Sequence, residues 1–154
     1  MSKKEQFIHI TDYGTKFYFS DREMTKLHRE DVPAIEWSSG RKEWYINNKR
    51  HREDGPAIEY PDGHKGWYLN GERHREDGPA IEYADGSKSW FINGKRHRED
   101  GPAVVWADGY KEWYINGEQL TEAEFNARIN PIELTLDEIA SKFGVSVNSL
   151  KIKK

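Results

Sequence analysis

One ten-residue stretch, HREDGPAIEY, occurs twice in the chain without a single change, at residues 51–60 and 74–83. Altered copies begin at residues 28 and 97, so each copy starts 23 residues after the one before it. A full unit reads approximately HREDGPAIEYxDGxKxWYINGKR. A fixed period of this length is typical of stacked arrays, in which each unit buries its apolar side chains only against its neighbours. The repeat therefore predicts an elongated array.

Two turn signals in each unit predict β-hairpins. Asn-Gly pairs at 70–71 and 93–94 are typical of two-residue hairpin turns, because both positions tolerate positive φ. Asp-Gly pairs at 62–63, 85–86 and 108–109 mark a second turn, and β-branched and aromatic residues lie between the turns. We therefore predict a mainly β fold, an elongated and twisted antiparallel β-meander of hairpin repeats with a small α-helical C-terminal cap.

Strand alternation predicts which side chains are buried. Trp90 and Ile92 should share one face of their strand, with Phe91 on the other, and Ile81 and Tyr83 should share a face of the neighbouring strand. We expect Trp, Ile and the Ile/Tyr pair to form the buried side. An evenly spaced aromatic row should then run along the opposite side, and it consists of Tyr45, Tyr68, Phe91 and Tyr114.

The period changes along the chain and divides it into three parts. Residues 1–27 contain a degenerate copy and are expected to cap the array at its N-terminal end. Residues 28–119 hold the four repeats. Residues 120–154 have helical spacing, so we predict a helical C-terminal tail there.

Capping-box patterns predict two helices in the tail. Thr121 is followed by Glu124 and Thr135 by Glu138, which is the spacing of reciprocal N-terminal caps. Gly144 is a suitable C-terminal cap for the second helix, and we expect one more short helix after it.

Composition excludes several classes of protein. The net charge of −3 argues against binding to nucleic acids or membrane surfaces. The absence of cysteine excludes disulfides, thiolate metal sites and cysteine nucleophiles. No apolar stretch has the length of a signal peptide core or a membrane span. We therefore expect a cytoplasmic protein.

The motif WYxNGxxHxxDGPAxxYxDG, which covers about residues 28–118, resembles the MORN-type repeat, in particular the variant of bacterial and phage proteins. The array followed by LTEAEFNARINP and a short helical tail is similar to small phage proteins. The resemblance implies an elongated twisted sheet, roles in protein or lipid-surface contact, and no shared catalytic activity. Arg and Glu follow the repeat histidine where the standard motif has a glycine, which argues against a lipid-binding role.

The repeat histidines invite a metal hypothesis, but their spacing argues against it. Equivalent residues lie two strands apart, roughly 9–10 Å, whereas zinc ligands lie about 2 Å from the metal. We therefore predict no metal and no cofactor, and expect each histidine to pack on its repeat tryptophan and to form a hydrogen bond with a neighbouring carboxylate or backbone group. The residues in these structural roles are His51, His74, His97, Trp44, Trp67, Trp90 and Trp113.

The HRED run does not predict an enzyme either. A catalytic group needs a singular environment, and four similar copies give four similar environments. We expect ladders of arginine and carboxylate side chains along successive strands. The arginines, expected to be exposed, are also candidate contacts for phosphates or acidic side chains, and they are Arg52, Arg75 and Arg98.

The aromatic row is the better binding candidate, because aromatic residues near arginine are typical interface anchors. Alternatively, the terminal helices or a second copy in a homodimer cover it. We predict a non-enzymatic interaction module that resembles phage-encoded proteins and binds or inhibits a host protein, an anti-defence candidate, through the repeat sheet. Replacing Tyr68 and Phe91 with Ala should then abolish partner capture and leave the fold intact.

Three alternatives stay open. A dimer groove with arginine and aromatic side chains could sequester a nucleotide or another small molecule. The segment LTLDEIASKFGVSVNSLKI resembles a helix-turn-helix, but its second helix would be very short, with basic residues only at its end, at 151–154, and phosphate neutralisation is poor. This segment could instead cap the open sheet end with Ile139, Phe143 and Leu150. A structural component of a virion is the third alternative.

Overall fold

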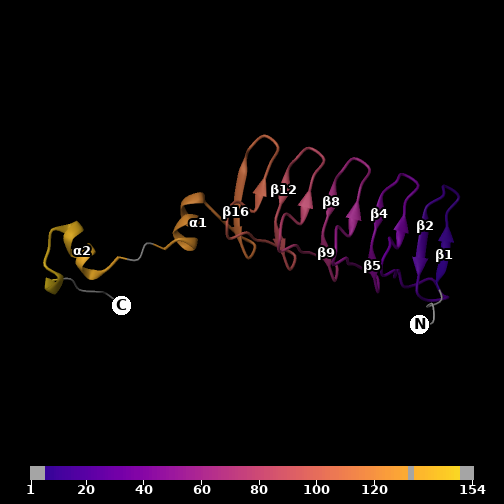
Figure 1. Ribbon diagram of the computed structural model, residues 1–154, viewed down its shortest axis with the longest axis horizontal. Coiled ribbons are helices and arrows are strands. Elements are labelled where there is room, and N and C mark those ends of the chain that lie inside the picture. The colour runs from indigo at the N-terminus through magenta and orange to yellow at the C-terminus, as the bar shows by residue number, and fades with distance from the viewer. Residues whose placement is uncertain (1–5, 132–133, 150–154) are drawn as a thin grey trace.

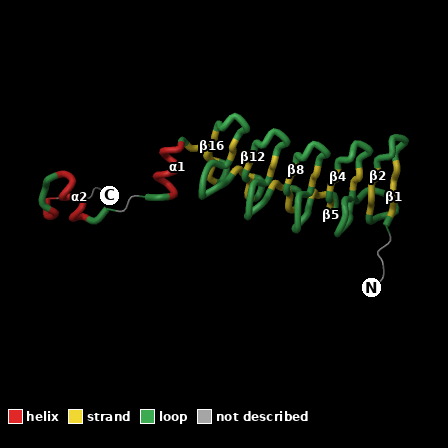
Figure 2. The backbone as a smooth tube through the Cα atoms, turned by 45° about the horizontal axis from the view of Figure 1, so that its top comes forward, coloured by secondary structure: helices red, strands yellow, loops and turns green. Residues whose placement is uncertain are grey.

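The computed structural model describes residues 6–131 and 134–149, and in them the repeats form one long row of hairpins (Figure 1). Most of each unit is turn and loop, with short strands between (Figure 2). Within these residues, no helix is long and apolar enough to cross a membrane. The predicted mainly β fold of antiparallel hairpin repeats followed by helices is confirmed.

Eleven strands form one main antiparallel sheet in the order β1-β2-β3-β4-β7-β8-β11-β12-β15-β16-β17. They are β1 (Phe7–Ile10), β2 (Lys16–Phe19), β3 (Ile35–Glu36), β4 (Lys42–Glu43), β7 (Ile58–Glu59), β8 (Lys65–Gly66), β11 (Ile81–Glu82), β12 (Lys88–Ser89), β15 (Val104–Val105), β16 (Lys111–Ile115) and β17 (Glu118–Leu120). Three small hairpins lie between them: β5 (Tyr45–Ile46) with β6 (Lys49–Arg50), β9 (Tyr68–Leu69) with β10 (Glu72–Arg73), and β13 (Phe91–Ile92) with β14 (Lys95–Arg96).

The predicted Asn-Gly turns are present. Asn70 has φ 52° and Gly71 φ 92°, so both central positions are in the positive region that a tight hairpin turn requires. Asn48 stands where the other units have glycine, and it adopts φ 64°. Its side-chain oxygen accepts the N–H of Leu27 at 2.6 Å, so this asparagine also ties the first turn to the preceding loop.

The chain leaves the main sheet at the repeat tryptophans. β12 ends one residue before Trp90 and β13 begins one residue after it. The Trp90 N–H still donates to the Ala103 carbonyl at 2.8 Å, but the ladder does not continue. The same break occurs at Trp44 and Trp67, whereas β16 runs without interruption over Lys111–Ile115.

The register of the main sheet overturns the predicted burial pattern. The prediction placed Phe91 on the side opposite the buried residues, but Ile81 pairs with Ser89, and alternation from Ser89 puts Phe91 on the side of Ile81. In the structure Ala80, Ile81 and Phe91 form one buried cluster, against which Trp67 and Tyr83 pack. Phe91 is only 7% exposed, so at this position the aromatic row belongs to the interior.

The register of the main sheet defines two rows of side chains. We call inner row the residues Phe17, Ile35, Glu43, Ile58, Gly66, Ile81, Ser89, Val104 and Glu112. We call outer row the residues Lys16, Glu36, Lys42, Glu59, Lys65, Glu82, Lys88, Val105 and Lys111. The outer row alternates between lysine and glutamate up to Val105, which takes the place of a glutamate.

In the described part of the tail, only the first helix covers the array. Helix α1 (Glu122–Ile129) contacts β16 and β17 and buries Phe125, and both predicted capping boxes are present. Helix α2 (Leu136–Phe143) and the 3₁₀ turn η1 (Val147–Ser149) lie beyond α1 along the long axis (Figure 1).

The second helix does not follow the prediction. Phe143 is 71% exposed, so its predicted packing on the sheet end is wrong. Leu150 and the basic residues at 151–154 lie outside the described part of the chain. The predicted Gly144 cap is present, with φ 64°.

Candidate functional site

Three of the four repeat arginines are held on a repeat tryptophan, whereas Arg29 of the first unit stacks over Tyr18. The guanidinium carbon of Arg75 lies 4.0 Å from the centroid of a Trp67 ring. Its Nη1 donates to the Pro79 carbonyl at 3.2 Å and to Glu82 at 3.0 Å, and its Nε donates to Asp77 at 2.9 Å. The hydrogen bond from Arg75 holds the pKa of Asp77 below its ordinary value. This arginine therefore organises its own loop.

The neighbouring arginines repeat the arrangement, with one difference. Arg52 stacks over Trp44 and Arg98 over Trp90, at 4.2 and 4.0 Å. Among the described residues Arg98 has no glutamate partner, because Val105 occupies that position. The side chains of Arg52, Arg75 and Arg98 are 21–23% exposed, so the expectation that these arginines are exposed is wrong.

The repeat histidines link one unit to the next. The Nδ1 of His74 accepts the backbone N–H of Asn93 at 3.2 Å, and its Nε2 lies 3.6 Å from Glu76. Equivalent bonds join His51 to Asn70 and His97 to Asn116. The predicted hydrogen bond to a backbone group is confirmed, and the group stacked on the tryptophan ring is the guanidinium.

Hollows lie between successive HRED loops on one side of the array. A hollow of about 760 Å³ lies between loop 52–56 and loop 74–77, and Trp67 and Leu69 are part of its lining. The next, of about 560 Å³, separates loop 75–79 from loop 97–100 and is lined by Trp90 and Ile92. These two share Arg75, Glu76 and Asp77 as a common wall, so they form a continuous row.

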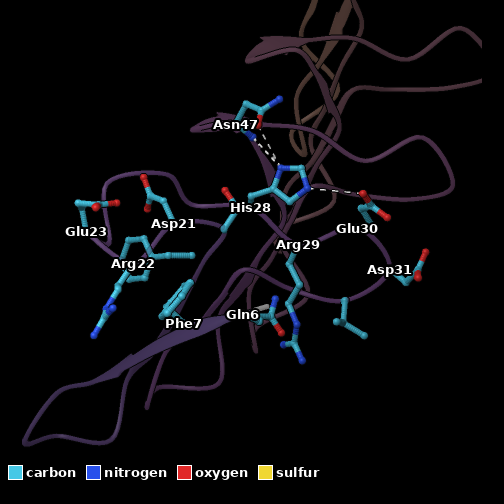
Figure 3. A pocket seen from close by; sticks show the side chains of 13 residues that line it. Gln6, Phe7, Asp21, Arg22, Glu23, His28, Arg29, Glu30, Asp31 and Asn47 are labelled. Carbon is cyan, nitrogen blue, oxygen red and sulfur yellow. Dashed lines mark hydrogen bonds and ion pairs between the residues drawn. The ribbon is translucent and has the colours of Figure 1, made fainter. Parts of the chain in front are cut away.

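The row has a further hollow at its C-terminal end, and a separate hollow lies near the N-terminus. Toward the C-terminus, about 490 Å³ lies between loop 99–102 and α1, with Trp113 and Phe125 in its lining. Near the N-terminus, a hollow of about 910 Å³ lies beside His28, and its lining includes Arg22, Arg29 and the carboxylates Asp21, Glu23, Glu30 and Asp31 (Figure 3). The α1 helix thus takes the place of the loop that a fifth unit would supply.

Carboxylates line the rims of this row. The hollow between loops 75–79 and 97–100 holds four carboxylates and two guanidiniums, a net charge of −4 + 2 = −2. The rim carboxylates are 72–85% exposed, and they are Glu53, Asp54, Glu76, Asp77, Glu99 and Asp100. The row is therefore acidic at its opening and aromatic and aliphatic in its lining.

The predicted aromatic row alternates with arginines that the sequence analysis missed. Arg50 lies 5.8 Å from the Tyr45 centroid and 5.6 Å from that of Tyr68. Arg73 and Arg96 lie 5.2 and 5.0 Å from Phe91 and Tyr114. Within the three small hairpins each such arginine stands directly opposite an aromatic residue. The two-residue turn fixes this pairing, so the turn in the sequence could have predicted these arginines.

The ring of Tyr68 packs closely onto the inner row. A Cβ atom added at Gly66 would lie 2.7 Å from Ile58 Cγ2 and 2.9 Å from Tyr68 Cε2. The Tyr68 ring therefore occupies the space that a side chain at position 66 would need. The structure thus gives this tyrosine a packing role, and a binding role for the aromatic row stays a prediction.

A buried carboxylate at the start of the array was also missed. Glu43, 1% exposed, accepts hydrogen bonds from Trp37 Nε1 at 2.8 Å, Tyr45 Oη at 3.0 Å and Arg50 Nε at 2.9 Å. Arg41 adds an ion pair at 2.7 Å. Burial, and then the charge of Glu43, raises the pKa of Tyr45.

Glu112 repeats this cluster in the last unit. It accepts from Trp106 at 3.0 Å and Tyr114 at 2.8 Å, with Arg96 at 3.3 Å. Burial works to raise the pKa of Glu112, but these donors outweigh it and the pKa is lowered. Tryptophan six residues before glutamate occurs only in the first and last units, which was the signal in the sequence.

No family model matches the chain, and no curated protein matches it. Among the described residues, no group of three or more histidine and carboxylate side chains is placed to hold a metal ion.

Proposed function

We propose that the protein is a non-enzymatic interaction module that binds an extended segment of a partner protein along the row of hollows between its HRED loops. The observation that supports this is periodicity, because hollows with the same lining recur from one unit to the next. From the resemblance to MORN-type repeats of phage proteins, we propose a host protein as the partner, with inhibition of a host defence as the purpose.

The spacing of the hollows defines the shape of the segment. Equivalent residues of successive units lie two strands apart, roughly 9–10 Å. A polyproline II helix has three residues per turn and rises about 3.1 Å per residue, so every third side chain points the same way about 9.3 Å apart. One partner residue in three can therefore enter successive hollows.

The chemistry of the hollows defines the side chain. Each of the two central hollows offers an aromatic and aliphatic wall, Trp67 with Leu69 and Trp90 with Ile92. The rim carries a net negative charge. Lysine and arginine bury an aliphatic stem and keep a cationic head at the surface, so they fit both features. We therefore propose a segment with a basic residue at every third position.

Fluorescence anisotropy with two labelled peptides tests the proposal. One has three Lys-Pro-Pro units, and the other has the same three lysines at every second position. We expect the first to bind at least tenfold more tightly and to weaken as salt is added. Equal binding of the two peptides would overturn the spacing argument.

A triple variant, Glu53→Gln, Glu76→Gln and Glu99→Gln, should lose the peptide while keeping the fold. These side chains are 84, 85 and 72% exposed. A matched control removes the same charge outside the row, by Asp12→Asn, Glu72→Gln and Asp137→Asn, at three exposed residues. If the control loses binding equally, net charge alone carries the effect.

Native mass spectrometry of the tagged protein, purified gently from bacterial lysate, tests the interaction as a whole. We expect an added protein mass on the wild type and on the control, and none on the triple variant. An added mass of a few hundred daltons would instead favour the small-molecule alternative.

A further inference from the structure

The two ends of the main sheet are protected differently. At the C-terminal end, α1 follows β17 and buries Phe125. At the N-terminal end, β1 pairs with β2 and has no second neighbour among the described residues. Its sequence, Phe-Ile-His-Ile, contains no proline and no Lys, Arg, Asp or Glu. Natural proteins guard exposed edges with such residues, so β1 is a template for strand pairing.

The free edge of β1 corresponds to the strand edge through which each later unit pairs with the unit before it. In an internal unit, β11 pairs with β12 of its own unit and also with β8 of the unit before it. β1 holds the equivalent position but pairs only within its own hairpin. The row of units therefore begins with a complementary edge that another antiparallel strand can extend.

The side chains of β1 match this interpretation. Ile8 is 50% exposed and Ile10 is 58% exposed. Ile10 stands opposite Lys16, so it continues the outer row, at a position where the internal units have glutamate. Two isoleucines on an uncovered strand would be buried by a neighbouring strand that offers apolar side chains on the same face.

We propose that β1 pairs antiparallel with β1 of a second copy, so that two 11-stranded sheets join into one two-fold symmetric sheet. The contact is self-complementary and closes, because α1 covers the other end of each sheet and prevents further growth.

Symmetry then selects the register. Residues that stand opposite each other in an antiparallel pair lie on the same face of the sheet. In a two-fold symmetric pair, one central residue therefore stands opposite the same residue of the second copy. The residues on either side of the central residue then stand opposite each other. With His9 opposite His9 of the second copy, Ile8 stands opposite Ile10 twice, and the four isoleucines form one apolar cluster. With Ile8 opposite Ile8, Ile10 would instead face Gln6. The first register buries more apolar surface.

Sedimentation equilibrium measures the assembly. We expect twice the chain mass of 18.1 kDa for the wild type, and the single mass for the variant Ile8→Lys with Ile10→Lys. A matched control changes exposed apolar residues of the tail, Leu136→Lys with Phe143→Lys, and should stay dimeric. A monomeric wild type, or a dimer that only the tail variant dissociates, would overturn the proposal.

Single-cysteine variants test the register, since the chain has no cysteine of its own. Directly opposed residues of an antiparallel pair have Cα atoms about 4.5–5.5 Å apart, which lies within the range of a disulfide. We expect His9→Cys to form a covalent dimer on mild oxidation, and Tyr13→Cys, which is 87% exposed at the hairpin turn, to stay monomeric in reducing-agent-free gels. Failure of His9→Cys to cross-link, or equal cross-linking of Tyr13→Cys, contradicts the pairing.

Discussion

The first unit contains a buried carboxylate, Glu43, and the stability of the unit depends on the ion pairs of this side chain. Removing one partner of a buried ion pair leaves the other charges uncompensated. Its two arginine partners are 25 and 35% exposed, so solvent screens part of the effect. We expect Glu43→Gln to lower the free energy of unfolding by about 2–3 kcal/mol, measured by urea denaturation. Glu112→Gln, which loses one guanidinium at 3.3 Å, should cost less, and the reverse order would contradict this explanation.

The burial of Phe91 changes the effect that we expect from its replacement. The sequence predicted that replacing Tyr68 and Phe91 with Ala would abolish partner capture and leave the fold intact. Because the ring is 7% exposed and packs on Ala80 and Ile81, we now expect a cavity that costs about 3 kcal/mol. Tyr68→Phe is the control, since it removes only a 3.4 Å contact with Arg73. Thermal unfolding should separate the two variants, and an unchanged midpoint for Phe91→Ala would restore the surface interpretation.

The aspartates of the HRED loops make the stability of the fold depend on pH in the acid range. A hydrogen bond from the adjacent arginine lowers the pKa of Asp54, Asp77 and Asp100 below the ordinary value of an aspartate. A carboxyl whose pKa is lower in the folded state adds stability above its unfolded pKa, and this stability is lost as pH falls through the folded pKa. We expect the thermal midpoint to fall below about pH 4. The triple Asp→Asn variant should show a smaller fall, and an identical profile would exclude these three groups as the cause.

At the scale of the strand, the outer row is interrupted at Val105. The neighbours on either side, Lys88 and Lys111, face valine where internal units offer glutamate, and Arg98 lacks its glutamate partner. We expect Val105→Glu to raise the free energy of unfolding by about 0.5 kcal/mol, an effect that salt should reduce. The reverse change, Glu82→Val, should lower it by a similar amount. Stabilisation that is independent of salt would contradict the electrostatic explanation.

Elements defined by neighbouring residues could be predicted from the sequence, and those defined by packing could not. The Asn70-Gly71 turn and the Thr121 cap each follow from a few adjacent residues, and both are present. The break at Trp90 was missed, because the main-sheet and hairpin residues together read as one continuous strand. The inward position of Phe91 was missed because the register was not known, and Ile81 pairs with Ser89, which shares a face with Phe91. Arg50 was missed for a related reason, since its role depends on the aromatic rings of two successive hairpins.

At the scale of the whole molecule, each unit is bound almost entirely to its two neighbours. The N–H of Arg75 donates to Phe91 in the next hairpin, and the N–H of Gly94 donates to Arg73 in the hairpin before. Contacts between adjacent units therefore replace a central core. Stability in such a molecule is the sum of unit terms and interface terms, so the number of units can change without changing the fold.

Deleting residues 74–96 tests this view, because it removes one complete unit and joins Arg73 to His97. The N–H of His97 can then donate to the Trp67 carbonyl, the acceptor that His74 uses in the wild type. We expect a folded, shorter array whose urea m value falls with the number of residues lost. One hollow is also lost, so a peptide with three lysines should bind no better than one with two. Unfolding of the deletion variant would contradict the additive view, and retained preference for three lysines would contradict the row of hollows as the binding surface.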